Sequence, residues 1–128
     1  MVSYGFIKST SLSFEDAEKR VKEEAGKEGF GILTRIDMQE KFKEKLGTDF
    51  KKYLILGACN PPNAYKAVQA EENIGLFLPC NIIIYEKDGK TVVAAIKPTV
   101  AMGMIENEGL KTLAVDIENK LKKIIDGI

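Results

Sequence analysis

Residues 81–96, NIIIYEKDGKTVVAAI, contain the clearest hairpin pattern in this chain. Two apolar runs, 81–85 and 91–96, flank Asp88-Gly89, a dipeptide that favours the tight turn between antiparallel strands. Pro98 follows the second run and ends it, because proline cannot donate a hydrogen bond to a neighbouring strand. The stretch therefore predicts an antiparallel sheet built around this hairpin.

Apolar runs before the hairpin extend this sheet. Residues 2–8, 30–36 and 53–58 are short and rich in β-branched and aromatic side chains, which is typical of strands. In the hairpin itself apolar residues occupy both alternating positions, so both faces of the sheet should be covered. The cover is expected to come from helical insertions or from a partner subunit, and we expect a homodimer.

Three helix starts lie between the strands. Ser13, Asp37 and Asn60 are residues that cap helix N-termini, and helical apolar spacing follows each of them. Gly29 and Gly47 are expected to end the first two helices. The third should bury the apolar positions Ala64, Ala67 and Val68.

A longer amphipathic helix closes the chain. Its apolar positions recur every three or four residues with polar residues between them: Leu110, Leu113, Ala114, Ile117, Leu121, Ile124 and Ile125. The predicted order is thus strand, helix, four strands, helix, with short helical insertions. This order indicates an α+β fold with helices on one face of an antiparallel sheet. With 128 residues, 45% of them hydrophobic, the chain should form a single domain over 1–128.

Composition excludes several functional classes. The 19 basic residues balance the 19 acidic ones, so no net charge attracts nucleic acid, and no basic stretch is interleaved with aromatics. No apolar run approaches the roughly 20 residues of a membrane span, and no secretory leader pattern is present. We therefore expect a cytoplasmic protein with free thiols that binds neither nucleic acid nor membrane. The chain has no histidine, which removes the commonest general base.

The chemistry that stands out is a pair of cysteine segments. If the strand before Cys59 and the strand after Cys80 are antiparallel neighbours, the two cysteines lie at the same end of the sheet. The last strand returns to this end of the sheet, so Met102 and Met104 should lie near the cysteines, whereas Asp37 lies at the opposite end. A parallel crossover would instead separate the cysteines by about 17 Å. Topology thus decides whether a paired-thiol site exists.

The residues around the cysteines are suited to more than one role. Cys59 precedes a helix start, where backbone amides favour a thiolate. Asn60 and Asn81 each follow a cysteine, and their side chains are suited either to orienting a ligand or to holding a turn. The sequence leaves both roles open.

Two motifs carry a family resemblance: LGACNPP at 56–62 and LPCN at 78–81, with Ile36-Asp37 before them and Ala64 after the first. Together they resemble the uncharacterised bacterial and archaeal family called domain of unknown function 302, over nearly the whole chain. The resemblance implies a fold like that of the TATA-binding protein and a dimer, but no reaction. DNA binding does not follow from such a fold, because function resides in sites. The family's signature positions fall on Cys59, Asn60, Pro61, Pro79, Cys80 and Asn81.

Three hypotheses of function remain. In the first, which we prefer, a small binding module uses those six signature residues to hold a small molecule or a soft metal. Thiolate and thioether ligands suit Cu(I) or zinc, so Cys59, Cys80, Met102 and Met104 are the candidate metal ligands, although no cofactor is required.

The second hypothesis is a thiol enzyme. Cys59 and Cys80 would form a reversible disulfide, or Cys59 would transfer sulfur, with activation from a helix terminus or a lysine because imidazole is absent. The third is a dimeric interaction protein whose cysteines only pack in the interior. Missing catalytic groups favour the binding module over an enzyme.

Overall fold

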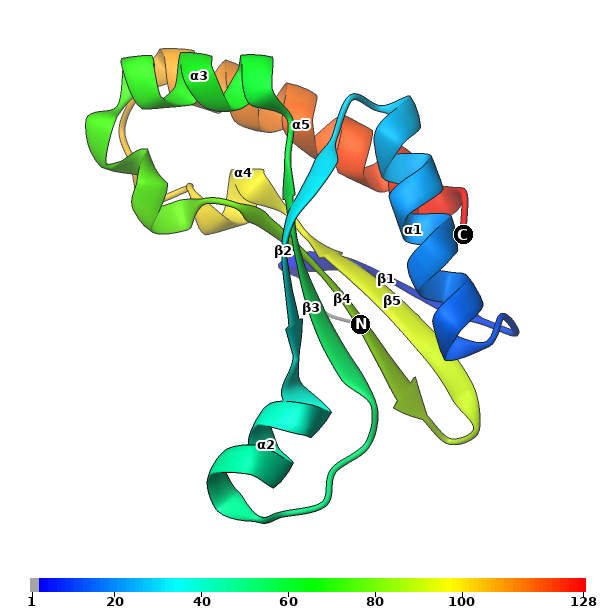
Figure 1. Cartoon of the computed structure of the whole chain (residues 1–128). Coiled ribbons are helices and arrows are strands. Elements are labelled where there is room, and N and C mark those ends of the chain that lie inside the picture. Colours follow the sequence, from blue (N-terminus) through cyan, green and yellow to red (C-terminus); the bar gives the residue numbers. More distant parts are fainter. Residues whose placement is uncertain (1–2) are drawn as a thin grey trace.

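Five antiparallel strands form one sheet in the order β1-β5-β4-β3-β2 in a computed structural model that describes residues 3–128 (Figure 1). The strands are β1 (Gly5–Thr10), β2 (Gly31–Asp37), β3 (Tyr53–Cys59), β4 (Cys80–Lys87) and β5 (Lys90–Ile96). The helices are α1 (Phe14–Lys27), α2 (Met38–Leu46), α3 (Pro61–Ala70), the 3-10 helix η1 (Glu72–Phe77), α4 (Pro98–Ala101) and α5 (Glu108–Asp126). The predicted α+β fold, with strand, helix, four strands, helix and short insertions, is confirmed.

The hairpin of β4 and β5 has the predicted turn. Asp88 and Gly89 have positive φ angles of 51° and 76°, as a two-residue turn between twisted strands requires. Lys87 and Lys90 pair across it. The first strand begins at Gly5, and the predicted start at Val2 lies outside the described residues.

Side-chain caps begin α1 and α2 at the positions that the sequence predicts, and α5 has a cap that was not predicted. The Ser13 hydroxyl accepts a hydrogen bond from the Asp16 amide, and the Asp37 carboxylate accepts one from the Glu40 amide. Asn107 caps α5 in the same way. These bonds satisfy amides that have no partner within a helix, so each fixes the residue at which its helix begins.

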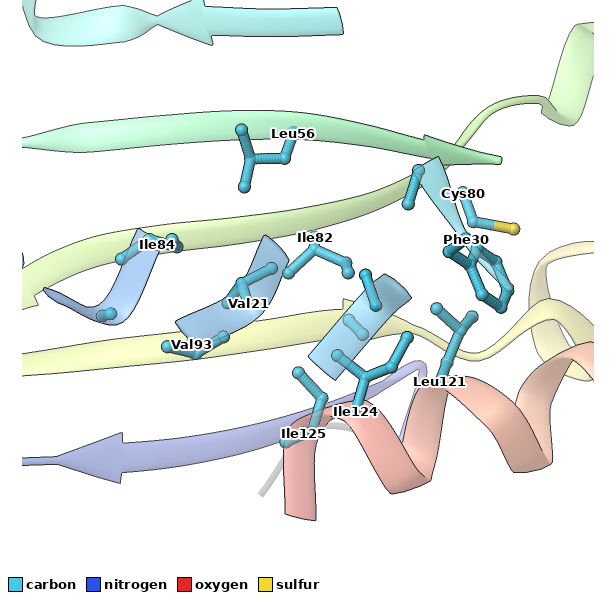
Figure 2. Packing of buried hydrophobic residues seen from close by; sticks show 14 of the residues in the cluster. Val21, Phe30, Leu56, Cys80, Ile82, Ile84, Val93, Leu121, Ile124 and Ile125 are labelled. Carbon is cyan, nitrogen blue, oxygen red and sulfur yellow. The ribbon is translucent and has the colours of Figure 1, made fainter. Parts of the chain in front are cut away.

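Helices α1 and α5 cover one face of the sheet (Figure 1). Figure 2 shows apolar side chains of these helices packed against alternate residues of β3, β4 and β5. Leu56, Ile82, Val93, Leu121 and Ile124 are fully buried there. Burial of such side chains stabilises each by about 1.5–3 kcal/mol, so this core anchors the strand ends that carry the cysteines.

A second apolar cluster lies beyond the ends of the strands, where α3, η1 and α4 gather around the first half of α5 (Figure 1). Ile74, Met102 and Leu110 are buried in it. The inner face of α3 is made by Ala67 and Asn63, and the prediction that Val68 is buried was wrong, because this side chain is 44% exposed. The helices α3, η1 and α4 thus pack beyond one end of the sheet and do not cover its second face.

The second face of the sheet carries apolar side chains in register. The pairing places Ile7, Ala94, Ile83 and Ile55 in one row across four strands. Within residues 3–128, the helices that pack on the sheet's core lie on the opposite face. In the same described part of the chain, none of the helices is both long and apolar enough to cross a membrane.

Candidate functional site

Cys59 and Cys80 lie at the same end of two neighbouring strands. Cys59 is the last residue of β3 and Cys80 the first of β4, and the antiparallel register sets Cys80 opposite Ala58. Asp37 lies at the other end of the sheet, as predicted. Both cysteines are free thiols, Cys59 half-buried and Cys80 only 5% exposed.

An apolar cavity of about 270 Å³ opens beside these strand ends, between the sheet, α3 and α5. Both cysteines line it, with Asn60 as the neighbouring polar side chain. The remaining lining is apolar: Phe30, Leu33, Ala58, Ala64, Ala67, Leu78, Pro79, Met102, Leu110, Leu113, Ala114 and Ile117. We call this space the thiol cavity. Cys80 and Phe30 lie together at the end of the core that borders it (Figure 2).

Asn60 fixes the wall formed by α3. Its side-chain oxygen accepts a hydrogen bond of 3.3 Å from the Asn63 amide and thereby caps the helix. Its amide group donates to the Glu28 carbonyl at 3.2 Å, which ties the helix start to the segment before β2. The predicted turn-holding role of Asn60 is therefore present, and the same residue borders the cavity.

A second tie crosses α3 and α5. Asn63 is only 8% exposed, and its side-chain amide donates a 3.2 Å hydrogen bond to the Asp116 carboxylate. A buried amide needs such a partner, because a lost hydrogen bond in a dry site costs about 1–3 kcal/mol. This bond holds the two helices that flank the thiol cavity at a fixed separation.

The two cysteine motifs also meet through their small residues. A Cβ added to Gly57 would lie 2.7 Å from Cγ of Pro79 and would meet the Thr34 hydroxyl even more closely. Only glycine fits at this position, because real Cβ atoms do not approach carbon so closely. The peptide bond between Leu78 and Pro79 is cis. Pro79 is half-buried and lines the thiol cavity as well.

Burial keeps the Cys80 thiol protonated. Loss of water around the side chain raises the pKa of Cys80 to about 11, and the charge on a Cys59 thiolate adds to the shift. At neutral pH Cys80 is therefore a neutral, weakly polar group in an apolar wall. In the described part of the chain, no group of three or more Cys, Asp or Glu side chains is placed to hold a metal ion.

The other predicted residues are divided between different surfaces. Met102 is buried and lines the thiol cavity, whereas Met104 is 78% exposed and lies outside its lining, so the two methionines do not converge as expected. Pro61 is exposed at the first turn of α3. Asn81 belongs to the second face of the sheet, where it lies opposite Gly57.

Sequence reasoning missed most of the cavity wall. Leu110, Leu113, Ala114 and Ile117 were predicted as a buried helical stripe, and the first half of that stripe in fact borders an open space. The signal was present in the small residues Ala64 and Ala114, which leave room between facing helices. Only the packing of α3 against α5 shows that this room is not filled.

Comparison with known proteins identifies the family of this chain. The family model described as "Domain of unknown function DUF302" matches residues 6–128. The chain is 33% identical in sequence to an uncharacterized conserved protein DUF302 from Bacillus stearothermophilus, which has a crystal structure. It superposes with a TM-score of 0.92 over 98% of each chain. No curated protein matches. The chain therefore belongs to the DUF302 family, a family whose function is unknown.

Proposed function

We propose that the protein is a small binding module that holds an apolar small molecule in the thiol cavity. The observation that carries the proposal is the cavity's wall, which is apolar except for Asn60 and the two thiols. Ligand sites are usually concave, largely apolar and preformed, with a few polar groups that orient the ligand. At about 270 Å³ the cavity suits a compact ligand, because an apolar cavity of about 150 Å³ already accommodates benzene.

The chemistry of the thiols favours this proposal over soft-metal capture. Metals bind the thiolate, and burial raises the pKa of Cys80 to about 11, which opposes thiolate formation at neutral pH. The second methionine, Met104, lies outside the cavity. A tetrahedral zinc site needs four ligands, and the cavity wall offers two thiols and the thioether of Met102.

The same feature argues against a thiol enzyme. A reversible disulfide between Cys59 and Cys80 needs both thiols to react near neutral pH, and the chain contains no histidine to deprotonate Cys80. Cys80 is both buried and protonated. Its neutral thiol suits contact with an apolar ligand better than nucleophilic attack.

Calorimetric titration of the full chain with 1-hexanol tests the proposal. Ala64 lies on the cavity wall, so Ala64→Leu should fill the cavity and weaken 1-hexanol binding at least tenfold. Ala70→Leu is the matched control, because Ala70 is an exposed residue of the same helix outside the lining. Equal binding by both variants, or no binding by the wild-type protein, would refute the proposal.

We further propose that a second copy of the chain covers the outer face of the sheet. Tyr53 and Tyr85 stack there with ring centroids 5.6 Å apart, next to the apolar row that contains Ile83. Ile7 in this row is 48% exposed. A contiguous apolar face of this kind is typical of a protein interface. A cytoplasmic setting stays a prediction that agrees with two free thiols.

A further inference from the structure

A second cavity, of about 280 Å³, adjoins the thiol cavity. Its lining comes from α4 and the connection after it, with Thr99 and Met102, and from the first half of α5, with Leu110, Lys111 and Ala114. We call it the lysine cavity. Three residues, Met102, Leu110 and Ala114, line both spaces. These shared side chains form the partition between the two cavities.

Met102 is the movable part of this partition. Leu110 and Ala114 are held on α5, a helix of 19 residues, whereas Met102 follows the four-residue helix α4. Its side chain is 6% exposed and is unbranched with a flexible thioether, which adapts to irregular apolar space. A change of rotamer at Met102 would therefore join the two cavities without unfolding either helix.

Lys111 makes one part of the joined space polar, so a ligand with one charged end would bind in a defined orientation. Of the described residues that line the two cavities, Lys111 alone carries a charge. Its ammonium lies 3.2 Å from the Glu108 carboxylate, and both side chains are largely exposed. An exposed ion pair of this kind contributes little to stability, so a ligand carboxylate can replace Glu108 at small cost.

We infer that the two cavities together bind an unbranched alkyl carboxylate. Its carboxylate lies beside Lys111, and its chain passes Met102 so that its end occupies the thiol cavity. This inference rests on the proposed function, since the thiol cavity must accept an apolar group. It adds the ligand class, the polarity of the ligand and the residue that admits the chain.

Competition between 1-hexanol and a series of alkyl carboxylates tests the inference. Hexanoate should fill only the lysine cavity and bind together with 1-hexanol, whereas tetradecanoate should displace 1-hexanol from the thiol cavity. Affinity should rise about fourfold for each added methylene as the chain is buried. All ligands are used below their micelle concentrations, with displacement followed by calorimetry.

Two variants test the partition and the cation. Met102→Ala should raise the affinity for tetradecanoate severalfold relative to that for hexanoate, because only the longer chain has to pass this side chain. Lys111→Gln should weaken tetradecanoate binding severalfold without affecting 1-tetradecanol. Lys122→Gln is the matched control, because Lys122 also lies on α5 and pairs with an exposed acid, Asp126. Thermal melting of each variant confirms folding.

The outcomes separate the two proposals. If 1-hexanol binds and tetradecanoate fails to displace it, or if Lys111→Gln and Lys122→Gln behave alike, the alkyl-carboxylate inference is wrong and the binding module stands. If 1-hexanol itself does not bind, both proposals fail. Displacement that depends on chain length and on Lys111 supports both.

Discussion

The ring of Pro79 packs against the backbone of Gly57, so that a Cβ at Gly57 would lie 2.7 Å from Cγ of Pro79. This contact joins the two cysteine motifs across neighbouring strands, because Gly57 belongs to LGACNPP and Pro79 to LPCN. It also fixes the position of Pro79, which lines the thiol cavity. The motifs are therefore two halves of one packing arrangement.

Gly57→Ala should lower the free energy of unfolding by about 1–3 kcal/mol, the usual cost of forcing an extra methyl group into a packed site. Gly31→Ala is the control, since Gly31 lies in the neighbouring strand and a methyl group added there would meet open space. Urea unfolding measures both. Equal stability of the two variants would show that the contact with Pro79 does not matter.

Asn60 should contribute to stability through two separate bonds. Asn60→Ala loses the helix cap and the bond to the Glu28 carbonyl, and it should lower the free energy of unfolding by about 1–2 kcal/mol. Asn60→Ser keeps a capping oxygen and should lose less. Chemical denaturation distinguishes these values. A serine variant as unstable as the alanine variant would assign the whole effect to the Glu28 bond.

Stability should fall at alkaline pH because of Cys80. Above pH 9 the unfolded thiol releases its proton, while the folded thiol, with its pKa raised to about 11, keeps it. The unfolded state then binds fewer protons, so the free energy of unfolding decreases by at most about 1.4 kcal/mol per pH unit until pH 11. The difference between wild type and Cys80→Ala from pH 8 to 11 isolates this effect. Parallel stability curves would contradict it.

The outer face of the sheet should mediate dimer formation. Light scattering at micromolar concentrations is expected to show a dimer for the wild-type chain and a monomer for Ile83→Lys, because the lysine would bury a charge in the interface. Val68→Lys, at an exposed position on α3, should remain dimeric. A wild-type monomer, or a dimeric Ile83→Lys, would exclude this face as the interface.

The sequence was informative where local chemistry decides the structure. Asp88-Gly89 predicted the hairpin, and Ser13, Asp37 and Asn60 predicted three helix starts, because turns and caps depend on a few neighbouring residues. The shared end of Cys59 and Cys80 followed from the expectation that their two strands are antiparallel neighbours, which the structure confirms. These features could be predicted without knowledge of packing.

The thiol cavity could not be predicted in the same way. Periodicity shows that Leu110 and Ala114 face inward but not whether another side chain fills the space before them. Met102 and Met104 are similar in sequence context, yet only Met102 turns into the interior. Buried Asn63 was unexpected because its partner, Asp116, lies 53 residues away. Long-range packing decides all three.

An NMR titration of the full chain with 1-hexanol tests ligand binding most directly, because each backbone amide reports its own surroundings. The thiol cavity predicts saturable shifts concentrated at Ala58, Cys59, Cys80 and Ala114, which line it on three different elements. Ala64→Leu should abolish these shifts. No saturable change, or changes centred on Ile83 and Tyr85 of the outer face, would contradict the proposed site.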